Sequence, residues 1–202
     1  MTQEEKKELL KIDLCARLPY GIATKCKVSN DHGVYFILAY NALYEKVLLN
    51  GARQNEWYGL NKIKPYLRPI DDLYREITHA GYNDGKPFVP IVECAKISHQ
   101  TFEKYTLSKN DWRKTTMPDL GMQYNLEYIV KTSNMGNLEY QFSYCAGLRR
   151  FSLRDNTRNI PMGLAYQVDL FDFLNRLMID YRGLIPAGLA RSVHDLDKNP
   201  YE

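Results

Sequence analysis

The first apolar residues of the chain recur every four positions, which is the spacing of one helix face. This stripe consists of Leu10, Leu14 and Leu18. Thr2 and Glu5 have the spacing of a capping box at a helix N-terminus, and Pro19 cannot continue a helix. The pattern therefore predicts a helix over residues 2–18.

The pattern then changes to the alternation of β-strands. In residues 22–28, small and apolar side chains alternate with Lys25 and Lys27, which are expected to face water. Further strands are predicted over residues 34–40, 44–49 and 57–64. Pro65 and Pro69 bracket an extended connector. Short antiparallel strands after one helix indicate a small curled sheet or a partly open barrel.

Helical spacing returns in the second half of the chain. Helices are predicted over residues 70–77 and from about residue 168 to a cap at Gly183. Residues 90–98 fit either a helix or a strand, and Pro90 at a first helical position favours the helix. Residues 99–119 are polar and are interpreted as a long excursion or a helix followed by a loop. The polar residues 192–202 are expected to fray.

A hairpin is predicted between these helices. Its arms are residues 120–132 and 138–146, which flank a polar turn. Tyr140, Phe142 and Tyr144 would share one face of the second arm. Phe151 and Leu153 would extend the hairpin by a third strand.

These elements predict an α+β fold, with short antiparallel strands and with the N- and C-terminal helices packed on them. We expect a single domain over residues 1–202. The alternative is two subdomains: residues 1–80, a helix plus a small sheet, and residues 88–191, a helix, a hairpin or sheet, and the C-terminal helix. The best candidate for a seam is near residues 81–87.

Composition narrows the class of protein. The 202 residues are 45% hydrophobic and 25% charged, values that exclude an intrinsically disordered chain. Mean hydropathy is −0.46, and we find no candidate membrane helix. The net charge of +3 is too small to demand a polyanionic partner.

Targeting signals and cysteine spacing indicate the cellular compartment of the protein. The N-terminal residues are acidic and polar and have no apolar run of a signal peptide. The cysteines, Cys15, Cys26, Cys94 and Cys145, form no Cys-x-x-Cys pair. We therefore predict reduced cysteines, a cytoplasmic location, no membrane contact, no metal site and no cofactor.

Three stretches together resemble an uncharacterised family of gut Bacteroidetes proteins that often lie near prophages or other mobile elements. The stretches are residues 13–21 (DLCARLPYG), residues 64–69 (KPYLRP), and residues 180–185 (DYRGLI) with 188–190 (GLA). They cover less than a quarter of the chain. The resemblance implies a small cytoplasmic protein and offers no catalytic residues to carry over.

A cluster of arginines provides a nucleic-acid hypothesis. The candidate binding residues are Arg149, Arg150, Phe151, Arg154 and Arg158. Guanidinium groups beside an aromatic ring can follow phosphates and stack on a base. The competing interpretation is a solvated, partly ion-paired strand end, which the low net charge favours.

Catalytic motifs are not found. The sequence contains no nucleophile elbow, no phosphate-binding glycine loop and no zinc-protease pair of histidines. Cys94 and His99 are five positions apart on a predicted helix and would nearly miss each other. A remote alternative is a hydrolytic enzyme whose site assembles from scattered residues such as Glu93, His99 and Asp111.

Tyrosine is abundant, with 16 residues, and it suits both half-buried sheet faces and binding surfaces. Together with the lack of catalytic motifs and the family resemblance, this leads to our first hypothesis. The protein is a non-enzymatic accessory protein of a phage or mobile element that binds an unknown protein partner. The alternative is nucleic-acid binding through residues 149–158.

Overall fold

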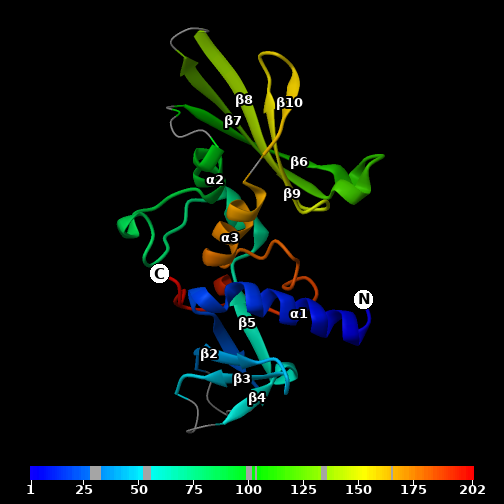
Figure 1. Ribbon diagram of the computed structural model, residues 1–202, viewed down its shortest axis with the longest axis vertical. Helices are drawn as coiled ribbons and strands as arrows, with labels where there is room; N and C mark the ends of the chain where they lie inside the picture. The colour runs from blue at the N-terminus through cyan, green and yellow to red at the C-terminus, as the bar shows by residue number, and fades with distance from the viewer. Residues whose placement is uncertain (28–32, 52–55, 99–101, 103, 133–135, 165) are drawn as a thin grey trace. The chain divides into compact units, whose positions relative to one another are not determined.

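The computed structural model describes residues 1–27, 33–51, 56–98, 102, 104–132, 136–164 and 166–202 (Figure 1). The fold is α+β, with an N-terminal helix, a C-terminal helix and two sheets that do not close into a barrel. The chain divides into two compact units. The terminal unit contains residues 1–71, 79–85 and 174–202, and the middle unit contains residues 72–78 and 86–173. The expected arrangement is a single domain, with subdomains 1–80 and 88–191 as the alternative; the two units have other bounds and interleave along the chain.

The terminal unit contains one long helix, α1 (Gln3–Arg17), and a six-stranded sheet. Its strands are β1 (Ala23–Cys26), β2 (Tyr35–Asn41), β3 (Lys46–Leu49), β4 (Trp57–Gly59), β5 (Ile63–Leu67) and β11 (Arg191–Ser192). Their order is β11-β5-β1-β2-β3-β4, and every pair is antiparallel except β11 with β5. Short 3-10 turns are η1 (Leu18–Tyr20), η2 (Leu60–Lys62), η4 (Asn83–Gly85) and η7 (Val193–Asp195).

The predicted N-terminal helix is confirmed, including its cap. The Thr2 hydroxyl accepts from the Glu5 N–H at 3.2 Å, and the Glu5 carboxylate accepts from the Thr2 N–H at 2.6 Å. The apolar stripe of α1 packs into the core of this unit. That core includes Leu10, Leu14, Ile22, Val47, Ile63 and Leu184.

The prediction of an extended connector between Pro65 and Pro69 is only partly right, because its first residues belong to the central strand β5. Pro65 lies opposite Thr24 of β1. A central strand forms backbone hydrogen bonds with a neighbour on each side, and a proline has no N–H to donate to either neighbour. Strand β11 pairs only with Tyr66 and Leu67, so Pro65 lies beyond the end of that pairing.

The middle unit contains the second sheet, with helix α2 (Pro90–Ser98) and the start of α3 (Gln167–Arg176). Its strands are β6 (Tyr105–Asp111), β7 (Met122–Thr132), β8 (Gly136–Cys145), β9 (Arg150–Asp155) and β10 (Ile160–Met162). They follow the order β10-β9-β8-β7-β6, and all neighbours are antiparallel. Turns η5 (Trp112–Lys114) and η6 (Pro118–Leu120) join β6 to β7, and η3 (Ile70–Tyr74) precedes the sheet.

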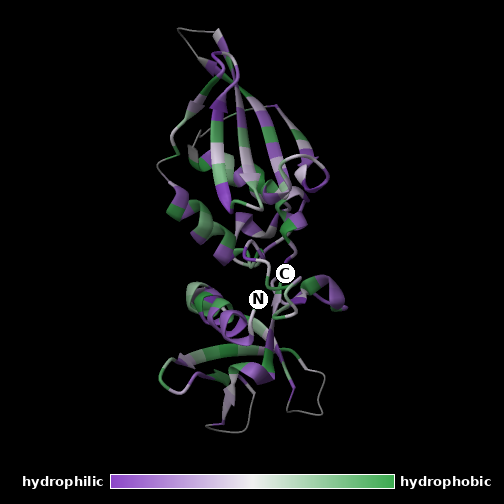
Figure 2. Cartoon of the chain, turned by 90° about the vertical axis from the view of Figure 1, so that its right-hand side faces the viewer, coloured by the Kyte–Doolittle hydropathy of each residue, from purple (hydrophilic) through white to green (hydrophobic). Residues whose placement is uncertain are grey.

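This second sheet has one aromatic face and one polar face. The predicted shared face of Tyr140, Phe142 and Tyr144 is confirmed, and all three side chains are buried. Rings from adjacent strands meet there, including Tyr128 with Tyr140 at 5.7 Å between centroids. Figure 2 shows the alternation as green and purple bands along the strands. We call the aromatic side the inner face and the polar side the outer face.

Two predicted elements of the middle region are wrong. Residues 70–77 do not form an α-helix: a 3-10 turn ends at Tyr74, and Ile77 exchanges two backbone hydrogen bonds with Phe88 instead. Residues 99–119 were expected to be an excursion, yet they contain strand β6. The side chains of β6 are mostly exposed because it is an edge strand, so its sequence lacks the apolar alternation of a buried strand.

The C-terminal region also differs from the prediction. Helix α3 ends at Arg176, and the chain then pairs with the residue after β5: the Arg68 N–H donates to Met178 O and the Asp180 N–H donates to Arg68 O, each at 2.8 Å. Gly183 is therefore not a helix cap. The tail is anchored rather than frayed, because Tyr201 is buried and bonded to the sheet.

Candidate interaction surface

The arginine cluster lies along strand β9 and the turns that flank it. Burial alternates along β9, so Arg150 and Arg154 lie on the exposed outer face. Arg149 occupies the turn before the strand, in a left-handed conformation with φ of 48°. Arg158 occupies the turn after it. The four arginines thus lie along β9 and in the turns at its two ends.

Phe151 does not lie on that exposed face, and its predicted role in base stacking is wrong. The Phe151 side chain is fully buried on the inner face. Its ring packs against Tyr144 at 4.9 Å and against Phe171 of α3 at 5.4 Å between centroids. Because a base cannot reach a ring inside the core, the arginines do not have the aromatic platform that the nucleic-acid hypothesis assumes.

Two of the arginines are held by neighbouring side chains. Arg158 contacts the buried carboxylate of Asp155 at 3.3 Å, and Asp155 also accepts the Arg158 backbone N–H at 3.0 Å. The guanidinium of Arg154 donates to the side-chain oxygen of Asn159. The turn is therefore a rigid support for Arg154 and Arg158.

Large apolar side chains are exposed in the segments that precede and follow β9 in the chain; those of β10 pair with Asp155 and Leu153 and so lie on the face of the sheet opposite Arg150 and Arg154. These apolar side chains come from β10, from the turn before β9 and from the start of α3. The exposed fractions are 46% for Ile160, 38% for Met162, 52% for Tyr166, 80% for Val168 and 57% for Leu148.

The segment from β10 to α3 is fastened along the edge of β9. Met162 lies opposite Leu153, and the side-chain amide of Gln167 then bonds to both backbone groups of Phe151, accepting at 3.4 Å and donating at 2.7 Å. Gln167 thus takes the place of a strand partner. We call the apolar residues Leu148, Ile160, Met162, Tyr166 and Val168, together with the four arginines, the edge surface.

This surface combines side chains that suit a protein interface. Arginine, methionine and tyrosine are enriched in such interfaces. Between residues 148 and 162 the chain has four arginines and one acid, Asp155. Since Asp155 is buried against Arg158, the exposed charge of this stretch is positive.

Two of the three family-like stretches, residues 13–21 and 180–185, meet in a different place, a buried polar network of the terminal unit. Arg17 Nε donates to both oxygens of Asp13 at 2.9 Å, and its Nη2 donates to Ile179 O at 2.7 Å. Arg182 Nη1 donates to Asp13 Oδ1 at 3.0 Å and to Asn175 Oδ1 at 3.2 Å.

Asp180 has a separate task in this network. Its two oxygens accept the backbone N–H groups of Leu184 and Ile185 at 2.8 and 2.7 Å. Burial raises the pKa of Asp180, against the effect of these two hydrogen bonds. The network joins α1 to the segment after α3, and its polar groups stabilise this connection.

The residues of the enzyme hypotheses have partners or environments of their own. Cys94 is fully buried, and burial raises the pKa of its thiol, which keeps it protonated. Glu93 accepts from Lys96 at 2.7 Å. Arg113 bonds to both oxygens of Asp111 and holds the pKa of that carboxyl at about 2. His99 lies outside the described residues.

The same described ranges lack a metal-binding cluster and a membrane-spanning helix. They contain no group of three or more His, Cys, Asp or Glu side chains placed to hold a metal ion. In that part of the chain, no helix is both long and apolar enough to cross a bilayer. All four cysteines are free thiols. Comparisons of the sequence and the fold with protein-family models, curated proteins and solved structures find no match.

Sequence reasoning found the arginines of the edge surface but missed its apolar part. The signal was weak: Ile160-Pro161-Met162 is a short apolar stretch between a turn and Gly163. Such a stretch reads as an ordinary strand end. Its exposure depends on its place at the edge of the sheet, which follows from the tertiary structure.

Proposed function

We propose that the protein is a non-enzymatic binding module that holds a protein partner through the edge surface. The partner presents apolar side chains surrounded by acidic groups. The carrying observation is that Ile160 and Met162 of the edge strand β10 are exposed on one face of the sheet, while Arg150 and Arg154 of the neighbouring strand β9 are exposed on the other face. Burial of such groups against a partner is the main source of affinity in protein complexes.

The edge strand itself favours recognition by side chains. An exposed strand edge can add a further strand through its backbone, and proline blocks this because it has no N–H. Pro161 is the middle residue of β10. We therefore expect the partner to contact the apolar and arginine side chains rather than to extend the sheet.

The same residues supported the nucleic-acid alternative, and the burial of Phe151 weakens it. What still favours that alternative is the common outer face of Arg150 and Arg154, which could follow phosphates without stacking. The crosslinking experiment below distinguishes nucleic-acid binding from protein binding. In line with the family resemblance, we propose that the module acts in the cytoplasm as an accessory protein of a mobile element.

Site-specific crosslinking tests the proposal. A photoreactive phenylalanine analogue replaces Tyr166 within the edge surface, and a control protein carries it at Leu43, which is 81% exposed in the terminal unit. We expect a discrete crosslinked protein from Tyr166 in host extract and none from Leu43. The proposal is contradicted if only nucleic acid is crosslinked at Tyr166. It is also contradicted if the same proteins are crosslinked at Tyr166 and at Leu43.

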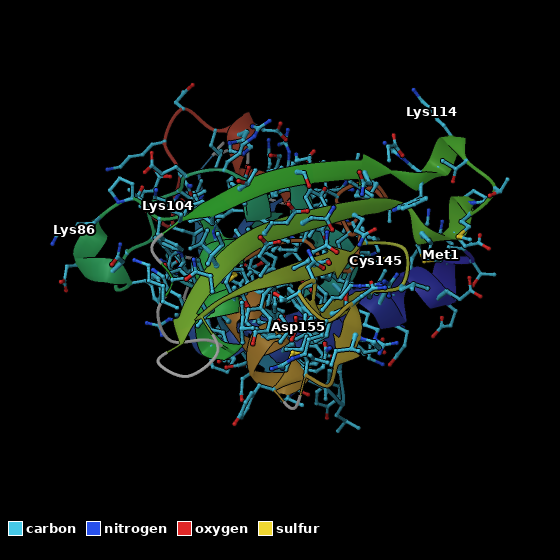
Figure 3. All side chains as sticks on the ribbon, turned by 90° about the horizontal axis from the view of Figure 1, so that it is seen from above. Met1, Lys86, Lys104, Lys114, Cys145 and Asp155 are labelled. Carbon is cyan, nitrogen blue, oxygen red and sulfur yellow. The ribbon has the colours of Figure 1, made fainter. Side chains whose placement is uncertain are left out.

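Charge variants identify the contribution of the arginines. We expect the double variant Arg150→Glu and Arg154→Glu to abolish the Tyr166 crosslink. Lys104→Glu is the matched control, because Lys104 precedes β6 at the opposite edge of the same sheet (Figure 3). Loss of the crosslink in both variants points to a general charge effect and contradicts recognition by β9.

A further inference from the structure

A groove of about 680 Å³ lies in the terminal unit, and none of its lining residues belongs to the edge surface. It is lined by the first two turns of α1, the ends of β1 and β4, the start of β5, and residues 187–189. Its charged lining residues are Glu4, Lys6, Lys7, Lys27, Glu45 and Lys64. Four lysines against two glutamates make the groove cationic.

The lysines continue onto the sheet beside the groove. Lys25 of β1 stands directly opposite Lys64 of β5. Lys27 comes next on the same side of β1, and its backbone N–H donates to Lys62 O at 2.8 Å. Like charges directly opposite each other destabilise a sheet. An anion bound near Lys64 would relieve this repulsion, although Lys25 itself does not line the groove.

The acids of the groove compensate only part of this charge. Glu45 forms ion pairs with Lys7 and, at 3.4 Å, with Lys11. Those two lysines lower the pKa of Glu45 and keep it ionised. In contrast, Lys6, Lys27 and Lys64 form no ion pair or side-chain hydrogen bond within the described part of the chain. Lys6 and Lys64 are also half-buried, so water solvates them incompletely.

We propose that this groove binds a small ligand carrying two or more phosphate groups. Lysine binds phosphate as a point charge, and several ammonium groups around one cavity suit a multivalent anion. A bound polyphosphate would supply the counter-charge that Lys6, Lys27 and Lys64 lack. The volume is ample for a phosphate chain, and apolar side chains such as Leu10 and Leu60 line the rest.

The proposal is tested by isothermal titration calorimetry of the full chain with inorganic tripolyphosphate at low salt. Lys6→Gln and Lys64→Gln each remove one ammonium group and should weaken binding about tenfold. Lys198→Gln is the matched control, because this exposed lysine of the same unit does not line the groove. Circular dichroism establishes that each variant is folded.

A gain of affinity provides a test that misfolding cannot imitate. Glu45→Gln removes a negative charge from the groove and releases Lys7 from its ion pair. We expect this variant to bind tripolyphosphate several-fold more tightly than the unmodified chain. Unchanged or weaker binding by a folded Glu45→Gln variant contradicts the proposal.

Two further titrations define the ligand. The first ligand is ATP, which carries the same phosphate chain. If ATP binds more tightly than tripolyphosphate, the apolar lining contacts the nucleoside. If the two bind equally, the groove recognises the phosphate chain alone. A single-stranded oligonucleotide that binds more tightly than both, with the same dependence on Lys64, overturns the proposal of a small ligand. So does the absence of heat with millimolar tripolyphosphate, or equal binding by Lys64→Gln and Lys198→Gln.

Discussion

Asp13 and Arg182 are 169 positions apart in the chain, and the guanidinium of Arg182 donates to the carboxylate of Asp13 at 3.0 Å. The same carboxylate accepts two contacts of 2.9 Å from Arg17, one turn further along α1. Asp13 and Arg17 are both fully buried. A buried charge is tolerated only when it is paired, so this contact ties the two ends of the chain into one unit.

Removal of the Asp13 charge should therefore be costly. Asp13→Asn leaves two guanidinium groups without their shared carboxylate, and we expect the free energy of unfolding to fall by about 3 kcal/mol. Urea unfolding followed by circular dichroism measures this loss. Asp197→Asn, at an exposed position of the same unit, should change the free energy by less than about 0.5 kcal/mol. Equal effects of the two substitutions would disprove the structural role of Asp13.

His79 should make the stability of the protein depend on pH. Burial, with Arg68 and Arg176 nearby, lowers its pKa from 6.5 to about 4. The unfolded chain binds a proton at this site below about pH 6.5, whereas the folded chain does so only below about pH 4. Stability is therefore fully present above pH 6.5 and decreases as the pH falls from 6.5 to 4, by on the order of 3 kcal/mol.

The variant His79→Phe separates this effect from the titration of carboxylates. Phenylalanine cannot take up a proton, and it can keep the ring packing against Tyr201, whose centroid lies 6.2 Å away. We expect unfolding midpoints in urea to fall less steeply between pH 6.5 and 4 in the variant than in the unmodified chain. Parallel curves for the two proteins would show that His79 does not contribute.

The opposed lysines of β1 and β5 predict that stability and ligand binding change in opposite directions. Lys25→Glu converts a repulsive cross-strand pair with Lys64 into an attractive one, which should add about 0.5 kcal/mol to the free energy of unfolding at low salt. The gain should vanish in high salt, where charges are screened. Lys25→Gln should give an intermediate value. The same Lys25→Glu variant should bind tripolyphosphate more weakly.

The Tyr201 hydroxyl should be needed to anchor the tail. It accepts the Ala23 N–H at 3.0 Å and donates to Tyr66 O at 2.8 Å. Tyr201→Phe keeps the ring but leaves both buried backbone groups unpaired, at a cost of about 2 kcal/mol in thermal or urea unfolding. Tyr44→Phe, at an exposed ring, serves as the control and should be neutral. A neutral Tyr201→Phe variant would indicate that the tail is held by packing alone.

The candidate surfaces differ in how far the sequence could reveal them. The arginines of β9 and the lysines of β1 are visible because each set lies within a few residues. The apolar part of the edge surface and the opposition of Lys25 to Lys64 are not visible, because both depend on which strands become neighbours. The inward direction of Phe151 could have been expected from alternation with Arg150, since neighbours in a strand point to opposite faces.

Local chemistry alone was enough to specify α1 and the hairpin of β7 and β8; over residues 90–98 it favoured the helix α2 but left a strand open. The capping box of Thr2, the apolar stripe and the alternation of Tyr140, Phe142 and Tyr144 act between residues close in the chain. Long-range hydrogen bonds determined the rest: the end of α3, the strand β11 and the anchored tail arise where the backbone near Arg68 pairs with residues more than a hundred positions away. Buried backbone N–H and C=O groups must form hydrogen bonds. The local pattern of apolar and polar residues does not indicate which distant segment will provide the partners.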